Sequence, residues 1–134
     1  MSVREYNNCF ACGKDNEIGL KLKFVENEGK YQALFTPSSN YQSYDEMLHG
    51  GIIATLLDEV MVNYVLHLTG RVTAFTAKLE VRYRKPVKIG AQLRVEATVS
   101  KHKANLYEME GKLYQVQENV LVAQGTAKVM LGAE

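Results

Sequence analysis

The sequence lacks several features that would restrict its function class. Its formal net charge is only +1, so the chain has no overall attraction to nucleic acid or to a membrane surface. The first ten residues contain no long apolar run, and neither a signal peptide nor a membrane span is expected there, which points to the cytoplasm. There is no internal repeat, low-complexity tract or linker. The 134 residues are expected to form one domain, 1–134.

Residues that bind metals are also scarce. Cys9 and Cys12 form the one CxxC pair, and a second CxxC or an HxxxH motif is absent, although a structural zinc site needs four ligands. The three histidines, His49, His67 and His102, are scattered. We therefore expect no metal and no cofactor, and interpret the cysteine pair as a folded N-terminal turn. A redox motif and a zinc ion shared between two subunits are the alternatives.

Hydrophobic periodicity predicts strands on both sides of one helix. Apolar residues alternate from 20 to 35 around the turn sequence ENEG, which indicates a hairpin. Apolar residues within 49–68 recur at helical spacing over a wide arc, which predicts a helix, and Gly70 is expected to end it. Four long strands are expected afterwards, within 71–86, 91–103, 104–117 and 119–131, joined as a meander with a turn near 118–119. The expected class is α+β, one central helix wrapped by a single antiparallel sheet. Since such a sheet has edges to protect, an oligomer is expected.

The helix has two unusual features. It opens with Gly50 and Gly51, which are poor helix formers, and it carries Asp58 and Glu59 among residues expected to be buried. Glycines here could let the helix pack close to a strand or to a partner helix. They could also expose backbone N–H groups at the positive end of the helix dipole. Asp58 and Glu59 could face solvent, and Glu59 is the better candidate for that position.

These residues resemble a known signature. His49-Gly50-Gly51 with Leu56 and Asp58 is similar to the HGG-x4-L-x-D motif of PaaI-like acyl-CoA thioesterases, which have the hotdog fold. Two other stretches, CFACGKDNEIGLKLKF and TAKLEVRYRKPVKIGAQLRVEATV, resemble the same superfamily. The resemblance covers nearly the whole chain and implies an acyl-CoA thioesterase. It is less specific to activity, because hotdog proteins include dehydratases, binding proteins and regulators.

The resemblance also implies roles for single residues. Amides of Gly50 and Gly51 would polarise the thioester carbonyl, and Asp58 would act as general base on water or as nucleophile. Gly51 and Asp58 are about 10 Å apart along a helix, so a two-fold dimer would bring Asp58 opposite the Gly50 amide of the other chain. Glu59 stays a second candidate, because a glutamate does the chemistry in another hotdog branch.

Further residues are expected to support this site. His49 would orient the loop or contact the thioester, or would simply cap the helix. Thr76 would help to position the aspartate or a water molecule, or would be an ordinary strand threonine. The family often carries an asparagine six residues before HGG. This chain has Ser43 there, with Gln42 beside it, so the attacking water would be held by different groups than in the family.

An acyl-CoA also carries phosphates, and two basic groups could bind them. Arg82, Arg84 and Lys85 form one group, and Lys101 and Lys103 end the next strand. If these strands were adjacent, the two groups would share one rim. The alternative is a solvated strand face.

Three functions compete. The first is an acyl-CoA thioesterase, active as a homodimer or homotetramer, with no nucleic-acid or membrane partner. The second is a dehydratase or hydratase, which would want a histidine base within the helix; His49 precedes the helix and His67 is near its far end. The third is a non-catalytic acyl-CoA binding or sensing module, which the departure at Ser43 permits.

Overall fold

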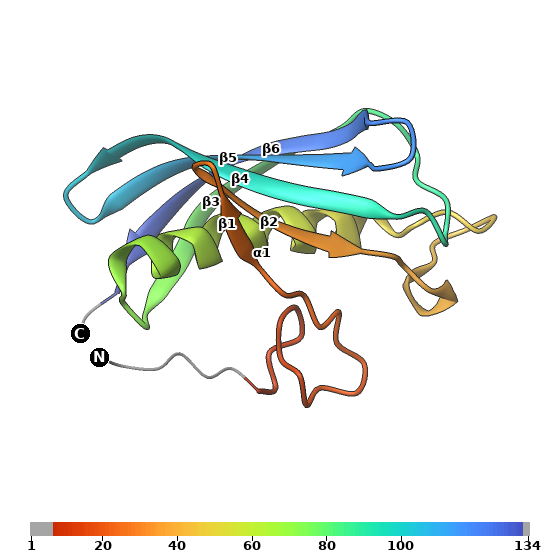
Figure 1. The fold of residues 1–134 in the computed structure, drawn as a ribbon, viewed down its shortest axis with the longest axis horizontal. Helices are drawn as coiled ribbons and strands as arrows, with labels where there is room; N and C mark the ends of the chain where they lie inside the picture. Colours follow the sequence, from red (N-terminus) through yellow and green to blue (C-terminus); the bar gives the residue numbers. More distant parts are fainter. Residues whose placement is uncertain (1–6, 133–134) are drawn as a thin grey trace.

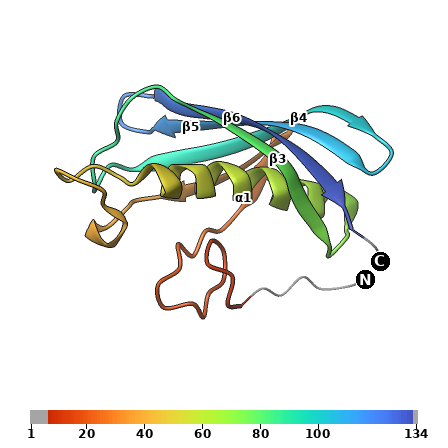
Figure 2. The same cartoon turned by 180° about the vertical axis from the view of Figure 1, so that it is seen from behind.

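The computed structural model describes residues 7–132, and shows one long helix packed on one face of a curved antiparallel sheet (Figures 1 and 2). The sheet has six strands in the order β1-β2-β4-β5-β6-β3. Their bounds are β1 Val25–Asn27, β2 Lys30–Phe35, β3 Ala74–Tyr83, β4 Leu93–Lys103, β5 Leu106–Gln115 and β6 Val120–Leu131. The helix α1 spans Gly50–Thr69, and a short 3-10 turn, η1, spans Ser39–Tyr41. The expected α+β layout is confirmed.

Local sequence signals account for most element boundaries. The β1–β2 hairpin turns at Glu28 and Gly29, both with positive φ, as expected for a two-residue turn between twisted strands. His49 is the N-cap of α1, and Gly70 ends the helix in the left-handed conformation. The turn before β6 includes Asn119, also at positive φ. Residues 20–24, which the alternation places in the first strand, are outside β1.

The order of the strands differs from the expected four-strand meander. β4, β5 and β6 do form a meander, but β3 pairs with β6 and not with β4. β3 therefore lies at one edge of the sheet, and β1 lies at the other. Strand pairing between distant segments is decided by the tertiary fold, and the sequence pattern of each strand does not specify its neighbour.

The core lies between α1 and the concave face of the sheet. Leu56, Leu57, Val60, Met61 and Val65 of the helix are fully buried there. This helix is long and apolar enough to cross a membrane by composition, but its apolar face packs on the sheet, as in the core helix of a globular domain. The burial explains why its apolar arc is wider than that of a surface helix.

Candidate functional site

The start of α1 is closed by its own N-cap residue. The Nδ1 atom of His49 accepts a hydrogen bond of 2.8 Å from the Gly51 amide. A Cβ atom at position 51 would lie 3.0 Å from that nitrogen and 3.1 Å from Cε1, so glycine gives the imidazole room to cap the helix. The Gly51 amide is thereby already occupied, and the neutral imidazole carries its proton on Nε2.

The Gly50 amide is different. Within residues 7–132 it has no hydrogen-bond acceptor, and the first turn of α1 contains no acidic residue. The hydroxyl of Tyr83, at the end of β3, donates a 2.8 Å hydrogen bond to the Gly50 carbonyl and holds this end of the helix against the edge strand. The Gly50 amide, at the positive end of the helix dipole, is therefore available to donate a hydrogen bond to an anionic or carbonyl oxygen.

Asp58 is held by the edge strand. The Thr76 hydroxyl donates a 2.6 Å hydrogen bond to Asp58 Oδ1, a length typical of a hydroxyl bound to a carboxylate. Both side chains are half-buried. The register of β3 against β6 shifts between Thr76 and Lys78, and such a bulge re-aims side chains of the strand. The two residues that the sequence singled out are thus brought together, with one carboxylate oxygen fixed.

Glu59 has other partners. Its Oε2 accepts a 2.9 Å hydrogen bond from Asn63 Nδ2, which also donates to the Glu59 carbonyl. Burial raises the pKa of the Glu59 carboxyl above its ordinary value, and the adjacent Asp58 charge raises it further, while the Asn63 hydrogen bond opposes both. No lysine, arginine or histidine of residues 7–132 forms an ion pair with this carboxylate. The expectation that Glu59 is the carboxylate that faces solvent is wrong, because its side chain is half-buried like that of Asp58.

The loop before the helix holds the next two candidates. The Ser43 hydroxyl and amide both donate to the Met47 carbonyl, at 3.1 and 2.7 Å, and so close this loop. Gln42 pairs with Leu48 in an isolated bridge. Both side chains are exposed. In this conformation Ser43 shapes the loop that leads to His49.

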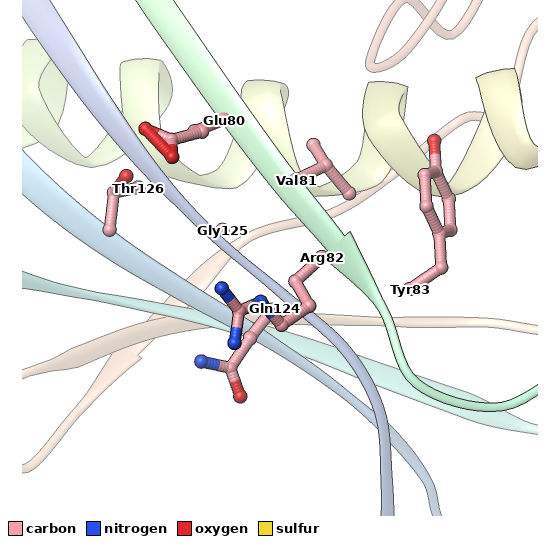
Figure 3. A pocket seen from close by; sticks show the side chains of 7 residues that line it. All are labelled: Glu80, Val81, Arg82, Tyr83, Gln124, Gly125 and Thr126. Atoms are coloured by element: carbon pink, nitrogen blue, oxygen red, sulfur yellow. The ribbon is translucent and has the colours of Figure 1, made fainter.

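The expectation that the basic residues share one rim is wrong within a single chain. β3 and β4 are separated by β5 and β6, and Arg82 and Lys101 lie toward opposite ends of the sheet. Arg82 lines a groove of about 540 Å³ along β3 and β6, together with Tyr83 and Gln124 (Figure 3). Arg84 and Lys85 follow β3 at this end, and Arg84 Nε donates to Gln124 Oε1 at 3.1 Å. Lys101 and Lys103 end β4, at the other end.

Tyr83 is a site residue that the sequence did not indicate. Tyr83 and Val81 fit the alternation of an ordinary strand, and their positions in the sequence do not indicate a contact with Gly50. Asn63 was missed for a different reason. It lies four residues after Glu59, on the same side of the helix, so the spacing was available, but a helix asparagine has many other uses.

Comparison with known proteins agrees with this architecture. A model of the thioesterase superfamily matches residues 46–122. The 3-hydroxyacyl-(acyl-carrier-protein) dehydratase FabZ of Oleidesulfovibrio alaskensis is 35% identical over 81 residues, which are 60% of this chain and 49% of that protein. The chain thus aligns with about half the length of this curated relative.

Two solved structures have the same fold. Zebrafish thioesterase superfamily member 2 has a TM-score of 0.76 at 23% identity, covering 90% of this chain and 87% of that one. A phenylacetic acid degradation-related protein from Ralstonia eutropha has a TM-score of 0.74 at 22% identity, covering 84% and 86%. The long helix on a six-stranded antiparallel sheet is the hotdog fold. Since the family model covers more than half of its residues, the chain belongs to the thioesterase superfamily.

Proposed function

We propose that the protein is an acyl-CoA thioesterase that hydrolyses an acyl-CoA to the free acid and CoA. The observation that carries this proposal is the half-buried Asp58 carboxylate, fixed by Thr76 on a helix whose first amide, that of Gly50, is available as a donor. Superfamily membership supports a thioester hydrolase in general.

The active unit in this proposal is a two-fold homodimer. Gly50 and Asp58 are separated by about two turns of one helix, too far to contact one carbonyl group together. β3 is an edge strand and exposes Phe75, Leu79 and Tyr83, at 55, 37 and 53%. An exposed apolar edge favours a partner, and a second copy related by a two-fold axis would place its helix antiparallel to α1. The enzyme would be a cytoplasmic dimer or a tetramer built from two such dimers.

The reaction then divides between two chains. The Gly50 amide of one chain donates to the thioester oxygen, which becomes negative as the carbon is attacked. Asp58 of the other chain takes a proton from water while the hydroxide adds to the carbon. The C–S bond then breaks, the CoA sulfur leaves as thiolate, and it takes up the proton. In the alternative route Asp58 itself adds to the carbon, the C–S bond breaks and CoA leaves as thiolate, and water then hydrolyses the resulting anhydride to the free acid and restores Asp58.

The coenzyme would lie toward the helix start. Arg82 lines the β3–β6 groove beside Gln124 (Figure 3), and Arg84 and Lys85 follow it at the same end of β3, so three cations at this end of the strand could bind the nucleotide phosphates. Lys101 and Lys103 could contact the same coenzyme only from another subunit, because they lie at the opposite end of the sheet.

The similarity to FabZ makes a dehydratase the second candidate. The described histidines do not favour it. His49 Nδ1 caps the helix, and His67 Nε2 lies 3.0 Å from Glu26 at the far end of α1. A dehydratase would need a histidine base beside a carboxylate at the thioester.

The experiment measures release of free CoA from short-chain, long-chain and aryl acyl-CoAs by the wild type, Asp58→Asn and Asp15→Asn. Asp15 is an exposed aspartate in the N-terminal turn and serves as the matched control. We expect turnover of at least one class, lost in Asp58→Asn and kept in Asp15→Asn. Hydration of enoyl thioesters without CoA release would indicate the dehydratase. Bound CoA with no turnover would indicate a sensing module.

A further inference from the structure

The two cysteines lie beside a third potential metal ligand. The Sγ atoms of Cys9 and Cys12 and a carboxylate oxygen of Glu59 all lie within 4.8 Å of one another. All three residues are half-buried, and the two cysteines are not joined by a disulfide. The N-terminal segment that carries the cysteines lies on the side of α1 away from the sheet (Figures 1 and 2). The third ligand therefore comes from the helix and is far away in the sequence.

The cysteine turn is a built structure. The Gly13 amide donates to the Cys9 carbonyl at 2.8 Å, and the Asp15 amide donates to the Asn7 carbonyl at 2.8 Å. A Cβ atom at position 13 would lie 2.4 Å from the Cys9 nitrogen and 2.5 Å from the Asn7 oxygen, so only glycine fits this tight turn. The backbone thereby holds both thiols on the side that faces Glu59.

The turn is also fixed to the rest of the fold. The Leu20 amide donates to the Phe10 carbonyl at 2.8 Å, and the Leu22 amide donates to the Ala11 carbonyl at 2.9 Å. Ala11, Leu20 and Leu22 are buried in the core cluster. The backbone between the two cysteines and the segment that follows the turn are thus anchored to the core, which fixes the positions from which the two thiols extend.

We propose that Cys9, Cys12 and Glu59 bind one zinc ion. Thiolates select zinc over Mg²⁺ and Ca²⁺, which take oxygen ligands. Zn–S and Zn–O bonds of about 2.3 and 2.1 Å place tetrahedral ligands about 3.5–3.8 Å apart, so side-chain shifts of about 1 Å close the site. A water molecule would take the fourth position. On binding, the two thiols release their protons to the buffer.

The surroundings of Glu59 support this assignment. Asn63 is buried and holds Glu59 Oε2, the kind of outer hydrogen bond that orients a metal ligand. No cationic side chain of residues 7–132 neutralises the carboxylate, although it is half-buried. A zinc ion would bind the carboxylate oxygen directly and would fasten the N-terminal turn to the middle of α1, and its two charges would be balanced by the two thiolates that form when it binds. The site does not depend on the proposed hydrolase activity, because it contains neither Thr76 nor Gly50.

The test measures metal binding by the full chain without substrate. Protein reduced with a phosphine and stripped with a chelator is titrated with Zn²⁺, and separately with Co²⁺, whose thiolate charge-transfer absorption reports sulfur ligands. We expect about one ion per chain, Co²⁺ bands typical of a tetrahedral thiolate site, and a higher melting temperature with zinc. The Co²⁺ spectrum of the wild type is informative even if a variant folds poorly.

The variants are Cys9→Ser, Cys12→Ser and Glu59→Gln, with Glu118→Gln as control, since Glu118 lies exposed in the β5–β6 turn. Either serine variant should lose stoichiometric binding, and Glu59→Gln should weaken zinc affinity at least about 10-fold. Glu118→Gln should bind as the wild type does. Absence of zinc uptake by the reduced wild type, a Co²⁺ spectrum without thiolate bands, or unchanged affinity in Glu59→Gln would overturn the assignment.

Discussion

Asp58 and Glu59 are consecutive carboxylates of one helix, yet they belong to two different environments. Asp58 receives a hydrogen bond from Thr76 of the edge strand, whereas Glu59 receives one from Asn63 and faces the cysteine turn. Consecutive helix positions point about 100° apart, so the same turn of α1 serves two faces. One helix can therefore present a proposed catalytic group on one side and a proposed metal ligand on the other.

The largest expected effect separates the two carboxylates by turnover. Asp58→Asn should lower kcat/KM for acyl-CoA by about 10²–10⁴-fold, since it removes the base or nucleophile. Glu59→Gln, assayed in chelator-treated protein, should keep kcat/KM within about threefold of the wild type, because it leaves every group of the proposed reaction in place. CoA release with a thiol reagent measures both. If the order of the two effects were reversed, Glu59 would be the catalytic carboxylate.

The hydrogen bond to Asp58 should matter less than Asp58 itself. Thr76→Val removes the hydroxyl that holds Asp58 Oδ1 and should lower kcat by about 10–100-fold, since Thr76 positions a group and takes no part in bond breaking. Thr76→Ser keeps a hydroxyl and should recover most of the activity. Equal losses in both variants would mean that the methyl group, and not the hydrogen bond, is what the site requires.

The contact at the start of the helix should have a smaller effect. Tyr83→Phe removes the hydrogen bond to the Gly50 carbonyl but keeps the ring, so about 1 kcal/mol of positioning energy is at stake. We expect kcat/KM to fall by about 3–10-fold, with unchanged zinc binding at the cysteine turn. Tyr114→Phe is the control, since Tyr114 lies in β5 and contacts Arg94. A loss of zinc affinity in Tyr83→Phe would show that the two faces of α1 are coupled.

A third carboxylate, Glu26, has a pKa shifted in the opposite direction from that of Glu59, and changes at its hydrogen bonds should have the smallest effect of those considered. The Tyr64 hydroxyl donates to Glu26 Oε2 at 2.9 Å, and this hydrogen bond, followed by that from His67, lowers the pKa of Glu26. Burial, followed by the Glu26 hydrogen bond, raises the pKa of Tyr64 to about 12.

The pH dependence of stability follows from these directions. A lowered carboxyl pKa contributes stability that is present above the unfolded value of 4.5 and is lost as the pH falls through the folded value. A raised tyrosine pKa contributes stability that is present below the unfolded value of 10.0. This stability is lost as the pH rises through the folded value of about 12. Tyr64→Phe should therefore lower the melting temperature at pH 7 and converge with the wild type in acid. A constant difference at every pH would assign its effect to packing alone.

The sequence predicted the helix and the strands more reliably than it predicted which strands lie side by side. The helix, its Gly70 end, the hairpin turn and the pairing of Asp58 with Thr76 follow from periodicity, turn residues and the resemblance. The position of β3 beside β6 could not be predicted in this way, because strand order depends on contacts between distant segments. For the same reason the two basic groups were placed on one rim, and neither Tyr83 near Gly50 nor Glu59 near the cysteines was foreseen.

The most direct test of the account asks whether Asp58 and Gly50 act from different chains. Asp58→Asn and Gly50→Val are expressed together with two affinity tags, and the mixed dimers are purified by both tags. The side chain introduced by Gly50→Val would cover the helix-end amide, so each parent homodimer should be nearly inactive. A mixed dimer contains one site with both wild-type groups and should show about half of the wild-type kcat. Mixed dimers as inactive as their parents would contradict a site shared between two chains.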